Sequence, residues 1–360
     1  MLEIKETETV QMPRICVIGI GGGGNNAVDR MIEAGLEHVE FINVNTDYQV
    51  LESSSAQNKL QIGKKLTGGF GAGADPTIGE ASAKESEESI LSTVTGANMV
   101  ILTCGLGGGT GTGAIPVIAE ICHNAGILTV AVVTIPFSFE GLVKQQLALS
   151  GLENLKKNVD TLLVIPNDKL LTLSEKSFYL DDAFTLADNV LKYTIEGITN
   201  IIFNRGMINL DFNDVKTTLV GKGLAHLGIG TISKDGSIID AVKQAIDSPL
   251  LDTDISSATN ILLNTSGRIN LMELNEAVSY VREITNASVN IIWGTVTDTT
   301  AADSIIVTLI ATGLEDTHKT VSTHGPVTAS APSASGNTNN VIKATPLEIP
   351  IFLKRYANRK

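Results

Sequence analysis

The stretch Gly105-Leu106-Gly107-Gly108-Gly109-Thr110-Gly111-Thr112-Gly113 decides how this chain folds and what it can bind. It follows the apolar run 99–104, which has the pattern of a buried strand, and precedes a helical pattern over 114–123. Glycines lose much conformational freedom on folding, so this many are useful only where backbone N–H groups must turn outward toward a ligand. We therefore predict a phosphate-binding loop, assisted by the positive end of the following helix.

Two more glycine-rich loops occur earlier in the chain. Residues 19–26 follow the strand-like run 15–18 and open a helical pattern over 27–34. Residues 68–76 precede another helix, with Pro76 suited to its first turn. A strand-to-helix turn without a ligand is the alternative for any single loop. Because there are three of them, a ligand shared by all the loops is the better interpretation.

Composition limits the class of protein. A chain of 360 residues, 43% hydrophobic and 18% charged, is expected to form two globular domains. The net charge of -13 argues against a nucleic-acid partner, because phosphate backbones select basic surfaces. Cys16, Cys104 and Cys122 are predicted to be reduced, buried thiols. The five histidines lack metal-ligand spacing, so we predict no zinc or iron site.

Neither a membrane span nor a signal peptide is recognisable in the sequence. No window reaches about 18 uninterrupted apolar residues, and residues 1–12 are too charged for a signal peptide. We therefore expect a soluble, cytoplasmic protein.

Short apolar runs alternate with helical patterns in the first half of the chain, with strands expected near 14–20, 39–44, 98–104, 127–134 and 160–165. This alternation predicts an α/β fold: a mostly parallel, Rossmann-like sheet covered on both faces, with ligands at the carboxyl ends of its strands. A long helix follows, then a short helix near 211–221. Strands near 260–264, 289–293 and 304–310, with a helix over 271–283, indicate a smaller α+β domain.

The composition also suggests how the chain is divided. We expect a flexible segment 1–12, a nucleotide-binding domain 13–180, a central helix 181–204, a second domain 205–315, a flexible linker 316–346 and a terminal peptide 347–360. The peptide ends in hydrophobic and basic residues over 347–355. A frayed tail is the simplest interpretation, but hydrophobic residues after a flexible tether favour a disordered peptide that docks on a partner.

Several short motifs identify the family. The chain has no Walker loop, and Gly19-x-Gly21-x-x-Gly24 fits the dinucleotide fingerprint but would leave loop 105–113 unused. From about residue 14 to 314 the chain resembles the tubulin/FtsZ superfamily of GTPases, and most closely bacterial FtsZ proteins. The resemblance is carried by Gly107-Gly108-Gly109-Thr110-Gly111-Thr112-Gly113, Asn45-Thr46-Asp47, Gly71-Ala72-Gly73-Ala74, Pro136-Phe137-Ser138-Phe139-Glu140-Gly141, Ile165-Pro166-Asn167-Asp168-Lys169-Leu170 and Asn209-Leu210-Asp211-Phe212-Asn213-Asp214.

The resemblance implies GTP or GDP as the ligand, with the three loops around its phosphates. It implies Glu140 as the ribose contact, Asn167 and Asn189 as guanine-reading residues and Phe184 as the ring that stacks on the base. Phe184 could instead be core, and Asn167 a turn former. The implied set is Gly21, Gly22, Gly23, Asn25, Asn45, Ala72, Gly73, Ala74, Gly107, Gly108, Gly109, Thr110, Gly111, Thr112, Thr134, Pro136, Glu140, Lys144, Asn167, Phe184 and Asn189.

The chain departs from its bacterial relatives at three places. Asp188-Asn189 puts an amide where those relatives have the base-reading carboxylate, so we expect weaker discrimination of guanine from adenine. Lys144 replaces an arginine and loses its forked geometry, which predicts a lower nucleotide affinity or turnover. Arg205-Gly206 replaces the usual Pro-Gly, without a predicted effect.

Asp211 and Asp214 lie far from the base-reading residues. Asp211 is 22 residues beyond Asn189, which is about 33 Å at the helical rise of about 1.5 Å per residue. On the sequence alone these aspartates are best explained as caps of the helix that begins there. The resemblance implies instead that they enter the pocket of the next subunit and orient the attacking water, helped by Asn209. It also implies Mg²⁺ between the β- and γ-phosphates, without confident ligands from protein side chains.

This arrangement implies a head-to-tail homopolymer, because the two halves of the site lie on different ends of one subunit. Loss of the γ-phosphate would weaken the contact and turn the filament over. The resemblance implies the cytokinetic ring at mid-cell, with 348–355 binding membrane-tethering adaptors and regulatory division proteins, so that membrane attachment is indirect. The alternatives are a specialised paralogue, a scaffold that binds nucleotide without hydrolysis, and an NAD-dependent dehydrogenase.

Overall fold

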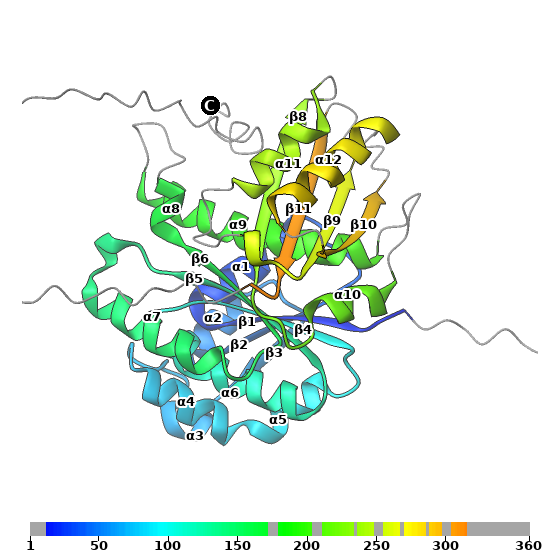
Figure 1. Cartoon of the computed structure of the whole chain (residues 1–360). Helices are drawn as coiled ribbons and strands as arrows, with labels where there is room; N and C mark the ends of the chain where they lie inside the picture. The colour runs from blue at the N-terminus through cyan, green and yellow to red at the C-terminus, as the bar shows by residue number, and fades with distance from the viewer. Residues whose placement is uncertain are drawn as a thin grey trace, which may run out of the picture.

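The computed structural model describes residues 12–171, 179–203, 211–233, 236–247, 255–266, 270–285, 288–296 and 304–314. Within them the chain forms a seven-stranded sheet and a four-stranded sheet. The long helix α9 (Leu180–Phe203) runs between the two sheets (Figure 1). The predicted N-terminal segment, linker and terminal peptide lie almost entirely outside the described residues.

The larger sheet is parallel throughout and has the order β3-β2-β1-β4-β5-β6-β7. The five predicted strands are confirmed to within about one residue at each end, because their apolar runs are nearly continuous, as expected for strands covered on both faces. In chain order the strands are β1 Ile15–Ile20, β2 Glu40–Asn45, β3 Asn58–Gln61, β4 Met99–Gly105, β5 Leu128–Ile135, β6 Thr161–Pro166 and β7 Gly223–Leu224.

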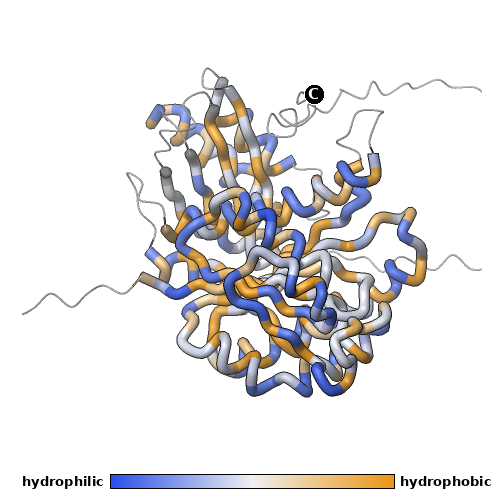
Figure 2. Tube along the Cα trace, turned by 180° about the vertical axis from the view of Figure 1, so that it is seen from behind, coloured by the Kyte–Doolittle hydropathy of each residue, from blue (hydrophilic) through white to orange (hydrophobic). Residues whose placement is uncertain are grey.

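Helices cover both faces of this sheet, and alternate strand residues face opposite layers. Val17 and Ile101 pack in the core that includes α9, whereas Ile18 and Leu102 pack in the core that includes α6. The hydrophobic strands therefore run through the interior of the molecule (Figure 2). The covering elements are α1 Gly21–Glu33, α2 Tyr48–Ser53, α3 Lys64–Thr67, α4 Pro76–Glu85, α5 Glu87–Val94, α6 Thr110–Asn124, η1 Ser138–Glu140, α7 Leu142–Leu155 and α8 Asn167–Leu171.

The smaller sheet has the order β10-β9-β11-β8, with β11 antiparallel to both of its neighbours. One face packs on α11 and α12, and the other packs toward α9 and α10. Its elements are α10 Phe212–Leu219, β8 His226–Ser233, α11 Ile238–Ile246, η2 Ile255–Ser257, β9 Asn260–Ser266, α12 Leu271–Ile284, β10 Asn290–Val296 and β11 Ser304–Thr312.

Two helices begin earlier than the sequence pattern indicated. The structure starts α1 at Gly21 rather than at Ala27, and α6 at Thr110 rather than at Ala114. Glycine has a low helix propensity, which is why the pattern missed these first turns. Each helix nevertheless begins directly at its glycine loop, so its first N–H groups belong to that loop.

The three cysteines are core residues. Cys16, Cys104 and Cys122 are free and buried, as predicted. Burial raises the pKa of the Cys16 thiol to about 11 and that of Cys122 to about 12, so these cysteines are unreactive core residues. In the described part of the chain, no helix is both long and apolar enough to cross a bilayer.

Candidate nucleotide-binding site

The three glycine loops meet at the carboxyl ends of β1 and β4. A Cβ placed on Gly21 would lie 2.8 Å from the amide nitrogen of Gly111. A Cβ on Gly109 would lie 2.8 Å from the nitrogen of Asp75 and 3.0 Å from the Cβ of Ala72. The loops before α1, α4 and α6 are therefore in direct contact, and the predicted residues 21–25, 72–74 and 107–112 form one site.

Some of these glycines are required by packing alone. A Cβ on Gly113 would overlap the carbonyl oxygen of Pro76, and one on Gly24 would overlap the carbonyl oxygen of Thr103. The first close approach lets α4 and α6 pack backbone to backbone, and the second seats α1 on β4. Gly113 belongs to the glycine-rich motif 107–113, but the close packing of α4 on α6 is enough to explain why this position is glycine.

Packing does not explain why positions 22 and 108 are glycine. Nothing lies within 4 Å of a Cβ built on either residue, and neither has a positive φ angle. Gly22 is exposed and Gly108 is half-exposed. Glycine at these two positions therefore leaves room for something outside the protein to approach the backbone, which is what a phosphate cradle requires.

The N-termini of α1 and α6 are suited to an anion. Neither helix has a side-chain N-cap or an acidic residue in its first turn. By contrast, α2, α4 and α10 begin with the caps Asp47, Asp75 and Asp211. The first-turn N–H groups and the helix dipoles of α1 and α6 therefore favour an anion at these two helix ends, although the whole chain is acidic.

Asn25 and Asn45 form a buried pair under the phosphate loops. The Nδ2 of Asn25 donates to the carbonyl of Gly19 at 2.8 Å, and its Oδ1 accepts from the Nδ2 of Asn45 at 2.7 Å. Thr46, which sequence reasoning gave no role, places its hydroxyl 2.7 Å from that of Thr110. These contacts tie the end of β2 to the starts of α1 and α6, so these side chains hold the two glycine loops in place.

The next wall of the site comes from the segment after β5. A Cβ on Gly107 would lie 2.9 Å from the carbonyl oxygen of Lys144 and 3.1 Å from the Cγ of Pro136, and the carbonyl of Thr134 accepts from the N–H of Leu106. Glu140 accepts from the backbone N–H of Phe137 at 3.0 Å and from Lys144 Nζ at 3.1 Å. Thr134, Pro136 and Lys144 therefore border the loop, and Glu140 is bonded to Lys144.

The residues predicted to contact the base lie next to this segment. Phe184 is 40% exposed and meets Phe137 edge to face, with ring centroids 5.6 Å apart. That exposure argues against Phe184 being a plain core residue. Asn167 is buried, and its Oδ1 has no hydrogen-bond partner. Because buried polar atoms are normally paired, Asn167 fits a residue that is completed by a ligand. Asn189 is also largely buried, on the same helix as Phe184.

An ion pair that the sequence did not reveal joins α1 to α9. Arg30 Nε lies 2.9 Å from Asp188 Oδ2, and a second guanidinium nitrogen lies 3.2 Å from the hydroxyl of Thr185. Burial raises the pKa of the Asp188 carboxyl to about 6, although Arg30 acts in the opposite direction. The pair holds α1 against α9 beside Asn189.

The burial of the Asp188 carboxyl predicts a pH dependence of stability. A carboxyl whose pKa is higher in the folded than in the unfolded state stabilises the fold less as the pH rises through those two values. We expect the free energy of unfolding of the wild type, relative to Asp188→Asn, to fall by about 2 to 3 kcal/mol between about pH 4 and pH 7. Urea titrations across this range measure it, with Asp181→Asn, an exposed carboxyl on the same helix, as control. A constant or rising difference contradicts the assignment.

Asp211 and Asp214 are not brought to this site. They form a reciprocal cap at the start of α10: Asp214 N donates to Asp211 Oδ1 at 2.8 Å, and Asp211 N donates to Asp214 Oδ2 at 3.2 Å. The last turn of α10 is bonded to Thr161, the first residue of β6. The helix therefore lies at the end of the sheet where the strands begin (Figure 1), whereas the glycine loops lie where they end. Asn209 is outside the described residues.

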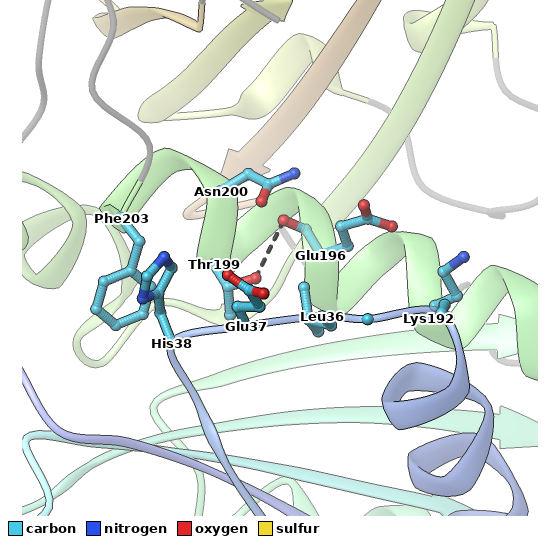
Figure 3. Close-up of a pocket in the computed structure, with 10 residues that line it drawn as sticks. Leu36, Glu37, His38, Lys192, Glu196, Thr199, Asn200 and Phe203 are labelled. Atoms are coloured by element: carbon cyan, nitrogen blue, oxygen red, sulfur yellow. Dashed lines mark hydrogen bonds between the residues drawn. The ribbon is translucent and has the colours of Figure 1, made fainter. Parts of the chain in front are cut away.

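A cavity of about 210 Å³ lies elsewhere, between the 34–38 segment and the second half of α9 (Figure 3). Glu37 and Thr199 face each other there, and the His38 ring lies against Phe203 with centroids 5.6 Å apart. None of the predicted site residues lines this cavity. It follows the carboxyl end of α1, so it is separate from the phosphate loops at that helix's amino end.

Comparison with known proteins places these features in context. The family model for the GTPase domain of the tubulin/FtsZ family matches residues 14–175, and the model for the C-terminal domain of the FtsZ family matches residues 223–315. An empty FtsZ dimer from M. jannaschii is similar at 44% identity, with a TM-score of 0.81 over 85% of this chain and 90% of that chain. A mutant FtsZ from M. jannaschii gives 44% identity and a TM-score of 0.79 over 84% and 92%.

A more distant structure shares the fold alone. The GTPγS-bound protofilament of CetZ2 from Haloferax volcanii gives a TM-score of 0.73 at 21% identity, over 84% of this chain and 94% of that chain.

Proposed function

Because the chain belongs to the FtsZ family of tubulin-like GTPases, we propose that each GTP is bound by one copy of the chain and hydrolysed with carboxylates from the next. Members of this family bind GTP and GDP, normally with Mg²⁺, and hydrolyse GTP, so the family assignment replaces the dehydrogenase alternative. The observation that carries the proposal is the separation of the glycine loops from α10 at opposite ends of one sheet.

The residues around the loops are assigned to parts of the nucleotide. The backbone N–H groups near Gly22 and Gly108 and the N-termini of α1 and α6 hold the phosphates. Glu140 contacts the ribose, Phe184 stacks on the base, and Asn167 and Asn189 read its edge. The open Cβ positions of the two glycines and the unpaired Oδ1 of Asn167 support this assignment.

A magnesium ion in this site would take most of its ligands from the nucleotide and water. In the described ranges no three His, Cys, Asp or Glu side chains gather to hold a metal, and the side-chain oxygens beside the phosphate loops include the hydroxyls of Thr46 and Thr110. Mg²⁺ is commonly bound through substrate phosphates and water rather than by an all-protein cage. When bound, it neutralises charge on the β- and γ-phosphates.

Asp211 and Asp214 are the proposed groups that orient the attacking water, with Asn209 beside them. Asp211 is exposed and Asp214 is half-buried, so their cap of α10 does not prevent contact with another molecule. A site that needs the pocket of one copy and the α10 end of the next makes a heterologous contact, which repeats into a filament unless it closes. Loss of the γ-phosphate then weakens that contact.

The proposed cellular role rests on the family. We assign the chain to the cytokinetic ring at mid-cell, and we retain the domain division 13–180, 181–204 and 205–315, with the last domain activating hydrolysis in its neighbour. The peptide at 348–355, outside the described residues, is proposed to bind membrane-tethering adaptors and division regulators. Self-association itself agrees with the similar FtsZ structure, which is a dimer.

Assembly and hydrolysis are tested together by sedimentation and phosphate release. The protein is incubated with GTP, GDP or NADH over a range of protein concentrations. We expect pelleting with GTP, and phosphate release per molecule that rises steeply with protein concentration. A rate per molecule that does not change on dilution contradicts a site shared between copies, and pelleting without phosphate release identifies a nonhydrolysing scaffold.

Base selectivity gives a separate prediction at Asn189. A carboxylate can accept from both the ring N–H and the amino group of guanine, whereas an amide offers one acceptor oxygen. Asn189→Asp is therefore expected to raise the ratio of GTP to ATP affinity about 10-fold, measured by competition binding. Asn200→Asp, at the other end of α9, is the control and leaves the ratio unchanged. An unchanged ratio in Asn189→Asp shows that this side chain does not read the base.

A further inference from the structure

The last turn of α10 is held by hydroxyl groups from both sheets. Thr161 of β6 donates its hydroxyl to the carbonyl of Leu219, and Thr312 of β11 donates to the carbonyl of Thr218 at 2.8 Å. The last four carbonyls of a helix lack partners inside that helix. Here two of them are paired by side chains that lie 94 and 58 positions away along the chain, so α10 is tied to the larger and the smaller sheet at once.

Both threonines are rigidly placed. Thr161, Thr218 and Thr312 are completely buried. The carbonyl of Thr312 accepts from the N–H of Thr259 at 3.0 Å, and the neighbouring Asp160 accepts from the N–H of Thr129 and of Gly221. The two hydroxyls therefore hold the end of α10 in a fixed position, because the buried threonines that carry them have little freedom to move.

These bonds hold the carboxyl end of α10, so a small change of the helix angle there displaces Asp211 and Asp214 at the amino end. Asp211 lies eight residues before Leu219, about 12 Å away at about 1.5 Å per residue. A tilt of about 10° at the held end moves the aspartates by about 2 Å at that radius. Displacement of a reacting group by about 1 Å can lower a rate by about 100-fold.

We propose that Thr161 and Thr312 are positioning residues, which set the angle at which α10 presents Asp211 and Asp214 to the nucleotide of a neighbouring copy. The inference rests on the proposed function, because it assumes that these carboxylates act on another subunit. Both threonines contact the end of α10, away from the glycine loops. Their effect is therefore expected in the rate of hydrolysis within filaments and not in GTP binding.

The test compares Thr312→Val, which keeps the shape and removes the hydroxyl, with Thr312→Ser, which keeps the hydroxyl. We expect Thr312→Val to bind GTP within about twofold of the wild type, and to release phosphate at least about 10-fold more slowly per sedimented subunit. Thr312→Ser restores the rate. Thr308→Val, a buried threonine on the same strand, is the matched control. Thr161→Val tests the same claim from the other sheet, including the case in which Thr312→Val fails to fold.

Filaments mixed from two variants distinguish a defect in the α10 end that donates the carboxylates from a defect in the nucleotide pocket. Gly108→Asp carries a defective pocket and an intact α10, so mixing it with Thr312→Val is expected to restore hydrolysis in the Thr312→Val pockets. Mixing Thr312→Val with Asp211→Asn restores nothing, because both lack a competent donor. Loss of GTP affinity in Thr312→Val, or a wild-type rate per sedimented subunit, overturns the positioning role. Failure of Gly108→Asp to restore Asp211→Asn instead overturns the proposed function itself.

Discussion

Replacing Asp211 by Asn is expected to lower phosphate release by filaments at least about 100-fold, the usual scale for losing a positioned acid–base group. GTP affinity of the isolated subunit is expected to stay unchanged, because Asp211 lies at the opposite end of the sheet from the glycine loops. Asn is as good an N-cap as Asp, so the substitution keeps the cap of α10 and removes only the charge. Labelled-GTP binding and phosphate release per sedimented subunit measure the two effects.

A matched control distinguishes this from a general effect of charge. Asp240 is an exposed aspartate in the first turn of α11, and Asp240→Asn is expected to keep wild-type activity. Capping alone predicts that Asp211→Asn is also fully active, since the cap remains. A fully active Asp211→Asn would therefore return Asp211 to the purely structural role that the sequence alone favours.

The second large effect concerns the glycines. Gly108→Asp is expected to lower GTP affinity at least about 100-fold, because a carboxylate near a phosphate is repelled by about 4 kcal/mol at 4 Å in a dielectric of about 20. Its thermal midpoint is expected to stay within a few degrees of the wild type, since nothing lies within 4 Å of the new Cβ. Equilibrium binding and thermal unfolding of the same preparation measure both quantities.

Gly113→Ala is expected to lower the thermal midpoint and to leave GTP affinity unchanged, the reverse of Gly108→Asp. Its Cβ overlaps the carbonyl oxygen of Pro76, so α4 and α6 must separate, and overpacking of this kind costs about 1 to 3 kcal/mol. The thermal midpoint falls, whereas the folded fraction still binds GTP. If Gly108→Asp unfolds the protein and Gly113→Ala does not, the division of the loop into ligand-facing and packing glycines is wrong.

The sequence predicted five of the seven strands of the larger sheet because they are nearly continuous apolar runs, whereas it missed the short strands β3 and β7. Such runs are unambiguous at Met99–Gly105 and Leu128–Ile135. The hydrophobic pattern did not predict strand β8, where close packing of a helix requires glycine in place of larger side chains. In β8, side chains at Gly228 and Gly230 would overlap the carbonyls of Ala245 and Ala241, so α11 can pack closely on a strand that lacks the usual alternation.

The candidate site was only partly predictable for a different reason. Motif spacing located the loops, but it could not divide their glycines into packing and open positions, since that depends on how α4 and α6 meet. The Arg30–Asp188 pair joins residues 158 positions apart, and no local pattern indicates it. The contacts of Thr161 and Thr312 with α10 likewise depend on two sheets coming together, which a linear pattern does not specify.

Hydrolysis by a mixture of Asp211→Asn and Gly108→Asp tests most directly whether the site is shared between subunits. Each variant alone is expected to be almost inactive, because one lacks the donor carboxylate and the other lacks the pocket. In an equal mixture, the pocket of one variant meets the intact α10 end of the other at up to about a quarter of the contacts, given random head-to-tail order. Phosphate release near that fraction of the wild-type rate is the predicted result. A mixture as inactive as its two components contradicts catalysis between subunits.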